Sequence, residues 1–169
     1  MDESGRDFIQ FIPRLRRYAR ALTGDRARAD DLVQDTLERA LRKFHLWQPG
    51  SNLRAWLFTI MHNLFVNQLR AQPAGMTDGL DDEAALMAVR PTQGDWLEVR
   101  DLQAALLRLP DEQREVLLLV GLEQMTYEET SGVLGIPMGT VMSRLSRARG
   151  RLRTLLADGV APAALKVVK

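Results

Sequence analysis

The segment 126–153, TYEETSGVLGIPMGTVMSRLSRARGRLR, constrains the fold more than any other part of the sequence. Thr126, followed three residues later by Glu129, gives the capping-box pattern that begins a helix. Gly135 and Pro137 then mark the end of that helix and the start of another. The segment therefore predicts two helices joined by a tight turn that contains glycine.

The second of these helices is predicted to run to about Leu156, with one apolar stripe and a basic surface. Apolar residues recur at spacings of four and three, at Val141, Leu145, Ala148, Leu152 and Leu155. Off that stripe stand Arg144, Arg147, Arg149, Arg151 and Arg153. No Asp or Glu occurs in 137–157, whereas a merely solvated helix would normally mix positive and negative charges. The pattern favours a DNA-binding helix-turn-helix over an Arg-rich surface helix.

The composition limits the protein classes that fit around this motif. The chain has 169 residues, enough for one medium domain or two small ones, and 46% of them are hydrophobic. It contains no Cys, which excludes disulfides and Cys-based zinc sites. No apolar run approaches the roughly 20 residues that cross a bilayer, and the start, MDESGRDF, is unlike a signal peptide. We therefore expect a cytoplasmic protein without membrane insertion.

Charge and periodicity divide the chain into two blocks. Residues 1–72 hold 12 Lys/Arg against 8 Asp/Glu, whereas residues 73–98 hold one Arg against six Asp/Glu. Helical periodicity dominates, with helices predicted at about 7–22, 26–44, 53–71, 95–109 and 111–122 before the helix-turn-helix. The second of these is predicted to bury Leu32, Val33, Leu37, Ala40, Leu41 and Phe44.

The predicted fold class is all-α, with two small helical domains on a flexible acidic linker. The expected boundaries are a first domain at 1–72, a linker at 73–94 with a short helix at about 82–89, a second domain at 95–157, and a tail at 158–169.

Four phrases in register carry a resemblance to a known family. They are LRRYARALTGDRARADDLVQDTLERAL (15–41), NLRAWLFTIMHNLF (52–65), LPDEQREVLLLV (109–120) and YEETSGVLGIPMGTVMSRLSRARGRL (127–152). In these segments the chain resembles an extracytoplasmic-function sigma factor of bacterial RNA polymerase, and its sequence there is similar to the general-stress-response subgroup. The resemblance implies that 1–72 is a region-two domain and 95–157 a region-four domain.

The second predicted helix carries a group of carboxylates. Asp31, Asp35 and Glu38 share one helical face, where like charges repel mildly and offer a docking surface to a basic partner. A solvated face is the alternative, and a magnesium site is a third interpretation that lacks a second carboxylate group or phosphate cradle. The resemblance implies that this helix binds the β′ clamp helices of the polymerase through Asp30, Asp31, Gln34, Asp35 and Glu38.

The loop after that helix and the helix that follows it form the next candidate site. Capturing a melted strand calls for polar groups around extruded bases, for stacking surfaces and for positive charge near the backbone. The resemblance implies contacts to the minus-ten element, for which the candidates are Trp47, Gln48, Ser51, Asn52, Arg54, Asn63 and Arg70. Trp56 is expected to be a core residue, and the sequence assigns no role to His62.

In the second block, the basic helix is the candidate reader of the minus-thirty-five element. A helix N-terminus presents backbone N–H groups to phosphate, and the side chains beyond it can reach base edges. The candidates are Pro137, Met138, Gly139, Thr140, Ser143, Arg144, Arg147 and Arg149. Met142 and Val120 stand where the family usually has basic residues, which bears on promoter sequence and DNA affinity.

The sequence gives no support for catalysis. It has no Gly-rich phosphate loop and no nucleophile beside a plausible base, and its two His have no metal-site spacing. We expect no enzyme activity, no cofactor and no metal. The resemblance implies core RNA polymerase (β′ and β subunits), promoter DNA and an anti-sigma factor as partners of a chain that is monomeric when free.

Two other function classes fit parts of the sequence. A helix-turn-helix regulator would bind duplex DNA without polymerase, and a helical interaction module would present its basic helix to an acidic protein. Neither class has a use for the acidic face or the polar loop of the first block, so both features favour a sigma factor.

Overall fold

The computed structural model describes residues 7–71 and 93–158, and every regular element within these two ranges is a helix. The N-terminal domain comprises α2 (Ile12–Thr23), α3 (Arg26–Arg42), the 3-10 helix η1 (Phe44–Leu46) and α4 (Leu53–Ala71). The C-terminal domain comprises α5 (Gln93–Leu107), α6 (Asp111–Gly121), α7 (Tyr127–Leu134) and α8 (Met138–Asp158). The predicted all-α fold with two helical domains is confirmed.

Parts of the prediction lie outside the described residues. These are the expected linker up to residue 92, its short helix at 82–89, and the tail after Asp158. The remaining two linker positions, 93 and 94, belong to the first turn of α5, so that helix begins before the predicted boundary.

The first helix begins later than the sequence pattern predicted. Residues 7–9 form a separate helical turn, and α2 begins only at Ile12 with Pro13 in its first turn. Proline has no N–H and clashes with the carbonyl four residues earlier, so a continuous helix from residue 7 was wrong. The helix ends at Gly24, which has φ 70° and donates its N–H to the Arg20 carbonyl at 2.9 Å.

Gly24 also marks a close approach between the two domains. A Cβ placed there would lie 2.6 Å from the side chain of Leu107, the last residue of α5. The left-handed backbone at φ 70° favours glycine at this turn, and any larger residue would also displace the Leu107 side chain.

The prediction for α3 was correct for most of its length and wrong at its end. Asp25 caps the helix by accepting the N–H of Ala27 at 2.9 Å. The buried stripe runs through Leu32, Thr36 and Ala40, and the Thr36 hydroxyl donates to the carbonyl of Leu32. Leu41, predicted to be buried, is 60% exposed because it lies about 100° around the helix from Ala40.

The helix-turn-helix forms as predicted. Thr126 caps α7 by accepting the N–H of Glu129 at 3.0 Å, and Gly135 ends the helix with φ 66°. In α8, the apolar stripe buries Val141, Leu145 and Ala148.

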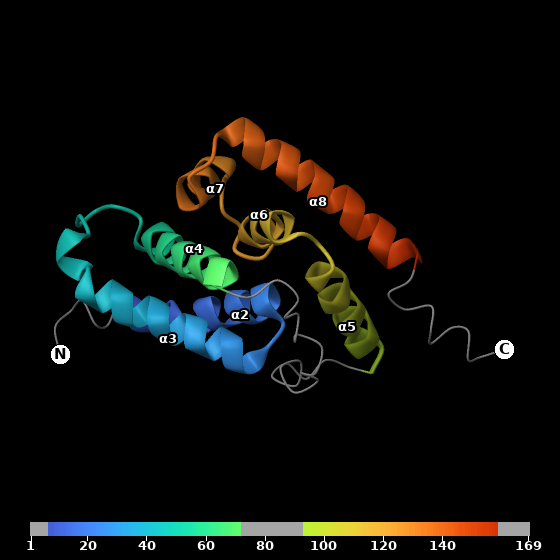
Figure 1. Ribbon diagram of the computed structural model, residues 1–169, viewed down its shortest axis with the longest axis horizontal. Coiled ribbons are helices and arrows are strands. Elements are labelled where there is room, and N and C mark those ends of the chain that lie inside the picture. Colours follow the sequence, from blue (N-terminus) through green and yellow to red (C-terminus); the bar gives the residue numbers. More distant parts are fainter. Residues whose placement is uncertain (1–6, 72–92, 159–169) are drawn as a thin grey trace.

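The two domains pack against each other. Helix α4 of the N-terminal domain contacts α7, and α2 contacts both α5 and α6 (Figure 1). One apolar cluster runs through both domains, from Leu15 and Phe58 on one side to Val116 and Leu145 on the other. Helices α3 and α8 lie at opposite edges of the molecule in Figure 1. Between them, α7, the first helix of the helix-turn-helix, packs against α4.

Candidate polymerase and nucleic-acid interfaces

The acidic surface of α3 is the first candidate site. Its apolar stripe faces the core of the N-terminal domain, which leaves the other side of the helix to solvent. All the residues predicted to bind polymerase are exposed there: Asp30, Asp31, Gln34, Asp35 and Glu38. The Glu38 carboxylate accepts a hydrogen bond from Arg42 at 2.6 Å. The surface is therefore free of packing against either domain and carries net negative charge.

The loop between α3 and α4 is the second candidate site. Trp47 is half-buried and stacks on Phe44, with ring centroids 5.4 Å apart and an interplanar angle of 26°. Trp56, predicted to be a core residue, is partly buried, stacks on the buried Phe8 and packs against the core. The Ser51 hydroxyl and N–H both donate to the Gln48 carbonyl, at 2.6 and 3.1 Å. The loop is thus a closed turn whose Gln48 and Ser51 side chains are exposed beside a packed indole.

Helix α4 presents its candidate residues on two opposite sides. Asn63 and Arg70 are seven residues apart, which places them on one face, and both are exposed. Arg54 precedes Asn63 by nine residues and so points the opposite way, toward the C-terminal domain. The structure brings Asn63 and Arg70 together but does not place Arg54 beside them.

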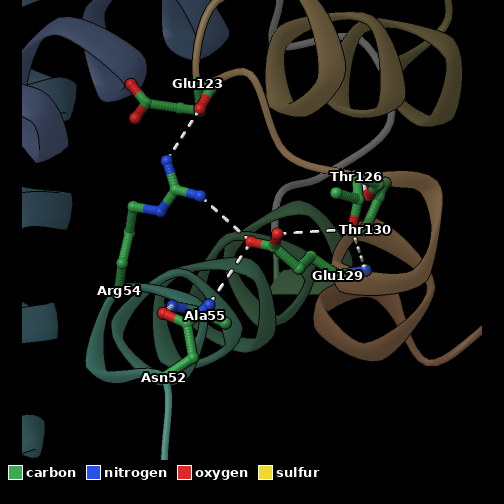
Figure 2. Close-up of polar contacts among 7 residues, drawn as sticks. All are labelled: Asn52, Arg54, Ala55, Glu123, Thr126, Glu129 and Thr130. Atoms are coloured by element: carbon green, nitrogen blue, oxygen red, sulfur yellow. Dashed lines mark hydrogen bonds and ion pairs between the residues drawn. The ribbon is translucent and has the colours of Figure 1, made fainter.

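Arg54 and Asn52 contact the C-terminal domain (Figure 2). The Arg54 guanidinium donates through Nη1 to the Glu123 carbonyl at 2.9 Å and through Nη2 to Glu129 Oε2 at 3.0 Å. The Asn52 amide nitrogen donates to the same Glu129 oxygen at 3.3 Å. Its amide oxygen accepts the N–H of Ala55, so Asn52 caps α4 as well. Two candidate minus-ten residues therefore already have partners within the chain.

Further contacts between the domains involve residues that were assigned no role from the sequence. His62 Nδ1 lies 2.6 Å from Glu115 Oε1, and Glu115 is only 5% exposed. Arg114, 7% exposed, donates to the Leu22 carbonyl of α2 at 3.0 Å. The available signal was the position of Arg114 and Glu115 directly before the apolar run 116–120 of α6, since charges that are drawn into a core require partners.

A cleft of about 210 Å³ lies at the same junction and contains a carboxylate with poor hydrogen bonding. Glu123 is 3% exposed, and Arg17 Nη2 approaches its Oε1 at 3.5 Å. Burial raises the pKa of Glu123, and Arg17, Arg14 and Arg54 oppose that rise. The cleft is lined by Arg14, Arg17, Arg54, Leu122, Glu123 and Gln124.

The basic helix α8 is the third candidate site. Its start and its outer face are accessible: Pro137, Met138, Gly139, Ser143, Arg147 and Arg149 are exposed, and Thr140 is partly buried. Arg144 is partly buried and pairs with Glu112 of α6 at 3.6 Å, and the Ser143 hydroxyl donates to the Thr140 carbonyl. The exposed Met142 lies on the same surface. The structure therefore leaves the start of α8, Ser143 and Arg147 accessible, whereas Arg144 is paired within the domain and Arg149 lies about 160° around the helix from Arg147.

The described part of the chain was searched for a membrane-spanning helix and for a metal site. No helix in residues 7–71 and 93–158 is both long and apolar enough to cross a membrane. Over the same residues, no group of three or more His, Cys, Asp or Glu side chains could hold a metal ion.

Comparison with known proteins gives matches to each domain and to about nine-tenths of the chain. Residues 9–62 match the family described as the Sigma2 domain of PhyR, and residues 100–152 match Sigma-70, region 4. The ECF RNA polymerase sigma factor EcfG of Rhodopseudomonas palustris (strain TIE-1) is 44% identical over 150 residues, which cover 89% of this chain and 83% of EcfG.

Two solved structures share the arrangement of helices. The sigma factor RpoE from Bartonella quintana, determined in complex with the anti-sigma factor NepR, aligns with a TM-score of 0.75 at 34% identity, covering 93% of this chain and 98% of that one. CnrH, determined in complex with the cytosolic domain of CnrY, aligns with a TM-score of 0.69 at 27% identity, covering 91% and 87%.

Proposed function

The chain belongs to the extracytoplasmic-function sigma factors, and on that premise we propose which surface performs each part of its function. As a sigma factor it binds core RNA polymerase and directs transcription initiation at specific promoters. The match to EcfG fits the general-stress subgroup that the sequence of this chain resembles. The family consists of initiation factors that are not enzymes, and the chemistry of RNA synthesis belongs to the polymerase.

The exposed face of α3 is the proposed polymerase-binding surface. Asp31, Asp35 and Glu38 lie on the outer side of a helix whose inner side is fixed by the core, so their geometry is set before a partner arrives. Preformed carboxylates of this kind suit the basic surface expected of the β′ clamp helices. This accessible acidic face is the observation that carries the assignment, since duplex DNA would be repelled by it.

The outer face of α4 and the adjoining loop are the proposed minus-ten surface. Asn63 and Arg70 share the solvent-facing side of α4, and Gln48 and Ser51 project from the turn that precedes it. Amide and hydroxyl groups can pair with the edge of an extruded base, and Arg70 can meet the backbone. Trp47 supports this turn by stacking on Phe44, and Asn52 and Arg54 contribute once released from Glu129.

The start of α8 is the proposed minus-thirty-five surface, held at its base by the core of the C-terminal domain. Val141 and Leu145 bury one side of the helix, which directs Ser143 and Arg147 outward to a major groove. The β subunit is the second proposed polymerase contact, made by the C-terminal domain.

We further propose control by an anti-sigma factor. RpoE of Bartonella quintana was determined with NepR and CnrH with the cytosolic domain of CnrY, and both align over about nine-tenths of this chain. A protein that binds both domains would hold them together and so prevent promoter recognition. The protein is proposed to act in the cytoplasm, as a monomer when free, without catalytic activity, cofactor or metal of its own.

Co-elution with core RNA polymerase on gel filtration tests the docking surface. Wild-type protein should co-elute with core, whereas Asp31→Lys/Asp35→Lys should lose most of that binding. Glu98→Lys/Asp101→Lys on α5 makes the same change of charge elsewhere and should retain it. Equal binding by all three proteins would refute the α3 surface. A wild-type protein that binds duplex DNA and never core would instead indicate a stand-alone helix-turn-helix regulator.

A further inference from the structure

The contact between α7 and the start of α4 is incompatible with simultaneous reading of two promoter elements. The minus-ten and minus-thirty-five elements are about 25 base pairs apart, which at about 3.4 Å per base pair is roughly 85 Å of duplex. Glu129 lies in the first turn of the helix-turn-helix, within hydrogen-bonding distance of Asn52 beside the proposed minus-ten loop. Helix α8, with 21 residues at about 1.5 Å each, extends only about 30 Å. The two domains must therefore separate before both elements can be bound.

One side chain makes most of the polar bonds at this contact. Glu129 Oε2 accepts hydrogen bonds from Asn52, the last residue of the loop, and from Arg54, in the first turn of α4 (Figure 2). Its other oxygen, Oε1, receives the Thr126 hydroxyl at 3.3 Å. In a capping box this carboxylate would instead accept the backbone N–H of Thr126. Glu129 thus bridges to the other domain instead of completing its own helix cap.

The pair is placed where a charge interaction has an appreciable effect. The Arg54 and Glu129 side chains are 20% and 27% exposed, so water screens them less than a fully exposed surface pair. The same arginine donates to the Glu123 carbonyl, which fixes its orientation toward the C-terminal domain. Arg54 therefore cannot reach promoter DNA while α7 remains in place.

We propose that Glu129 is an autoinhibitory residue, whose carboxylate holds the helix-turn-helix domain against the start of α4 and keeps the free sigma factor closed. This inference rests on the proposed function, because closure inhibits only a protein that must place its domains on separate promoter elements. The α3 surface is accessible in the closed form, but core polymerase can engage α3 and the C-terminal domain together only in open molecules, so its apparent affinity is reduced by the open fraction.

Distances between spin labels measure the closure directly. The chain has no Cys, so Arg39→Cys on α3 and Ala157→Cys on α8 provide two unique labelling sites. In that background, Glu129→Gln removes the charge and Glu129→Lys places a cation opposite Arg54. The ratio of open to closed molecules should rise about fivefold for Glu129→Gln and at least tenfold for Glu129→Lys.

Glu128→Lys is the matched control, because Glu128 is an exposed carboxylate in the same first turn of α7 and carries the same helix-dipole cost. It should leave the label distances as in the parent protein. Reversing the pair, Arg54→Glu with Glu129→Lys, should restore part of the closed population. If Glu129→Lys gives the same distances as Glu128→Lys, the closure does not depend on Glu129 and the proposal is overturned.

Affinity for core polymerase, measured by fluorescence titration of the same proteins, tests whether the closure is inhibitory. Glu129→Lys should bind core more tightly than Glu128→Lys, by up to the factor found for the open population. Opening without tighter binding would refute autoinhibition and leave the sigma assignment intact. A wild-type protein that fails to bind core at all would instead refute the proposed function, whereas the label distances would still report on the Glu129 contact.

Discussion

His62 of α4 and Glu115 of α6 face each other across the domain boundary, with Nδ1 and Oε1 2.6 Å apart. Both side chains are largely buried, so each depends on the other for a polar partner that water does not supply. The pair belongs to the same interface as Glu129 and Arg54, and it joins two residues that are 53 positions apart in sequence.

The first prediction concerns this pair. His62→Ala should destabilise the folded protein by about 1–3 kcal/mol, because it leaves a buried carboxylate without its hydrogen bond. Replacing Glu115 with alanine as well should recover part of the loss, which gives a coupling energy of about 1 kcal/mol in a double-mutant cycle measured by urea unfolding. Additive losses would show that the two side chains act independently.

Arg114 is expected to be the most sensitive position in the interface. Its guanidinium donates to the carbonyls of Leu22, Leu106, Leu107 and Leu109 at 2.8–3.0 Å. Arg114→Ala should cost about 3–5 kcal/mol of unfolding free energy, since several buried carbonyls lose their donor at once. Arg114→Lys should also be destabilising because an ammonium cannot span all four acceptors. The exposed Arg108→Ala serves as control, and an equal loss there would contradict this account.

Glu123 gives a prediction about pH. Burial raises its pKa above the ordinary 4.5, so the folded protein holds the carboxyl proton more tightly than the unfolded chain does. Stability should therefore fall as pH rises from about 4.5 through the raised pKa, and stay lower above it. Glu123→Gln should be more stable than wild type in urea unfolding at pH 7, by a margin that disappears at low pH. Glu128→Gln is the reference for loss of an exposed carboxylate, and a less stable Glu123→Gln at pH 7 would contradict the prediction.

Arg147 gives a prediction about DNA. It is exposed on the outer face of α8, where it can neutralise a phosphate or reach a base edge. If it contacts phosphate, Arg147→Ala should weaken duplex binding uniformly across sequences and reduce the slope of log affinity against log salt by about one. Fluorescence anisotropy over a salt series measures both effects. Arg39→Ala, on the opposite edge of the molecule, should change neither.

The parts of the fold that depend on neighbouring residues in sequence could be predicted. Helix α4 has the predicted bounds of 53–71, and the caps at Thr126 and Gly135 are local patterns that the structure confirms. The prediction that Leu41 is buried was wrong because hydrophobic spacing does not give the width of the buried stripe, and Leu41 lies about 100° around α3 from Ala40.

The domain interface could not be predicted, because spacing along one helix does not tell which other element covers it. From the sequence, Glu129 was assigned to a helix cap and Arg54 to DNA binding, whereas the structure joins the two residues. His62 received no role, although it is bonded to a residue 53 positions away. Such pairs depend on tertiary packing, and the position of two segments in the sequence does not tell whether they lie close together in space.

Run-off transcription by core RNA polymerase is the most direct test of the central claim that this chain is a sigma factor. The template carries a promoter upstream of genes whose transcripts rise when the protein is overproduced. We predict a transcript of defined length only when the protein is added, and its loss with Asp31→Lys/Asp35→Lys. If core with wild-type protein makes no specific transcript while the protein still binds that duplex, the chain does not act as a sigma factor.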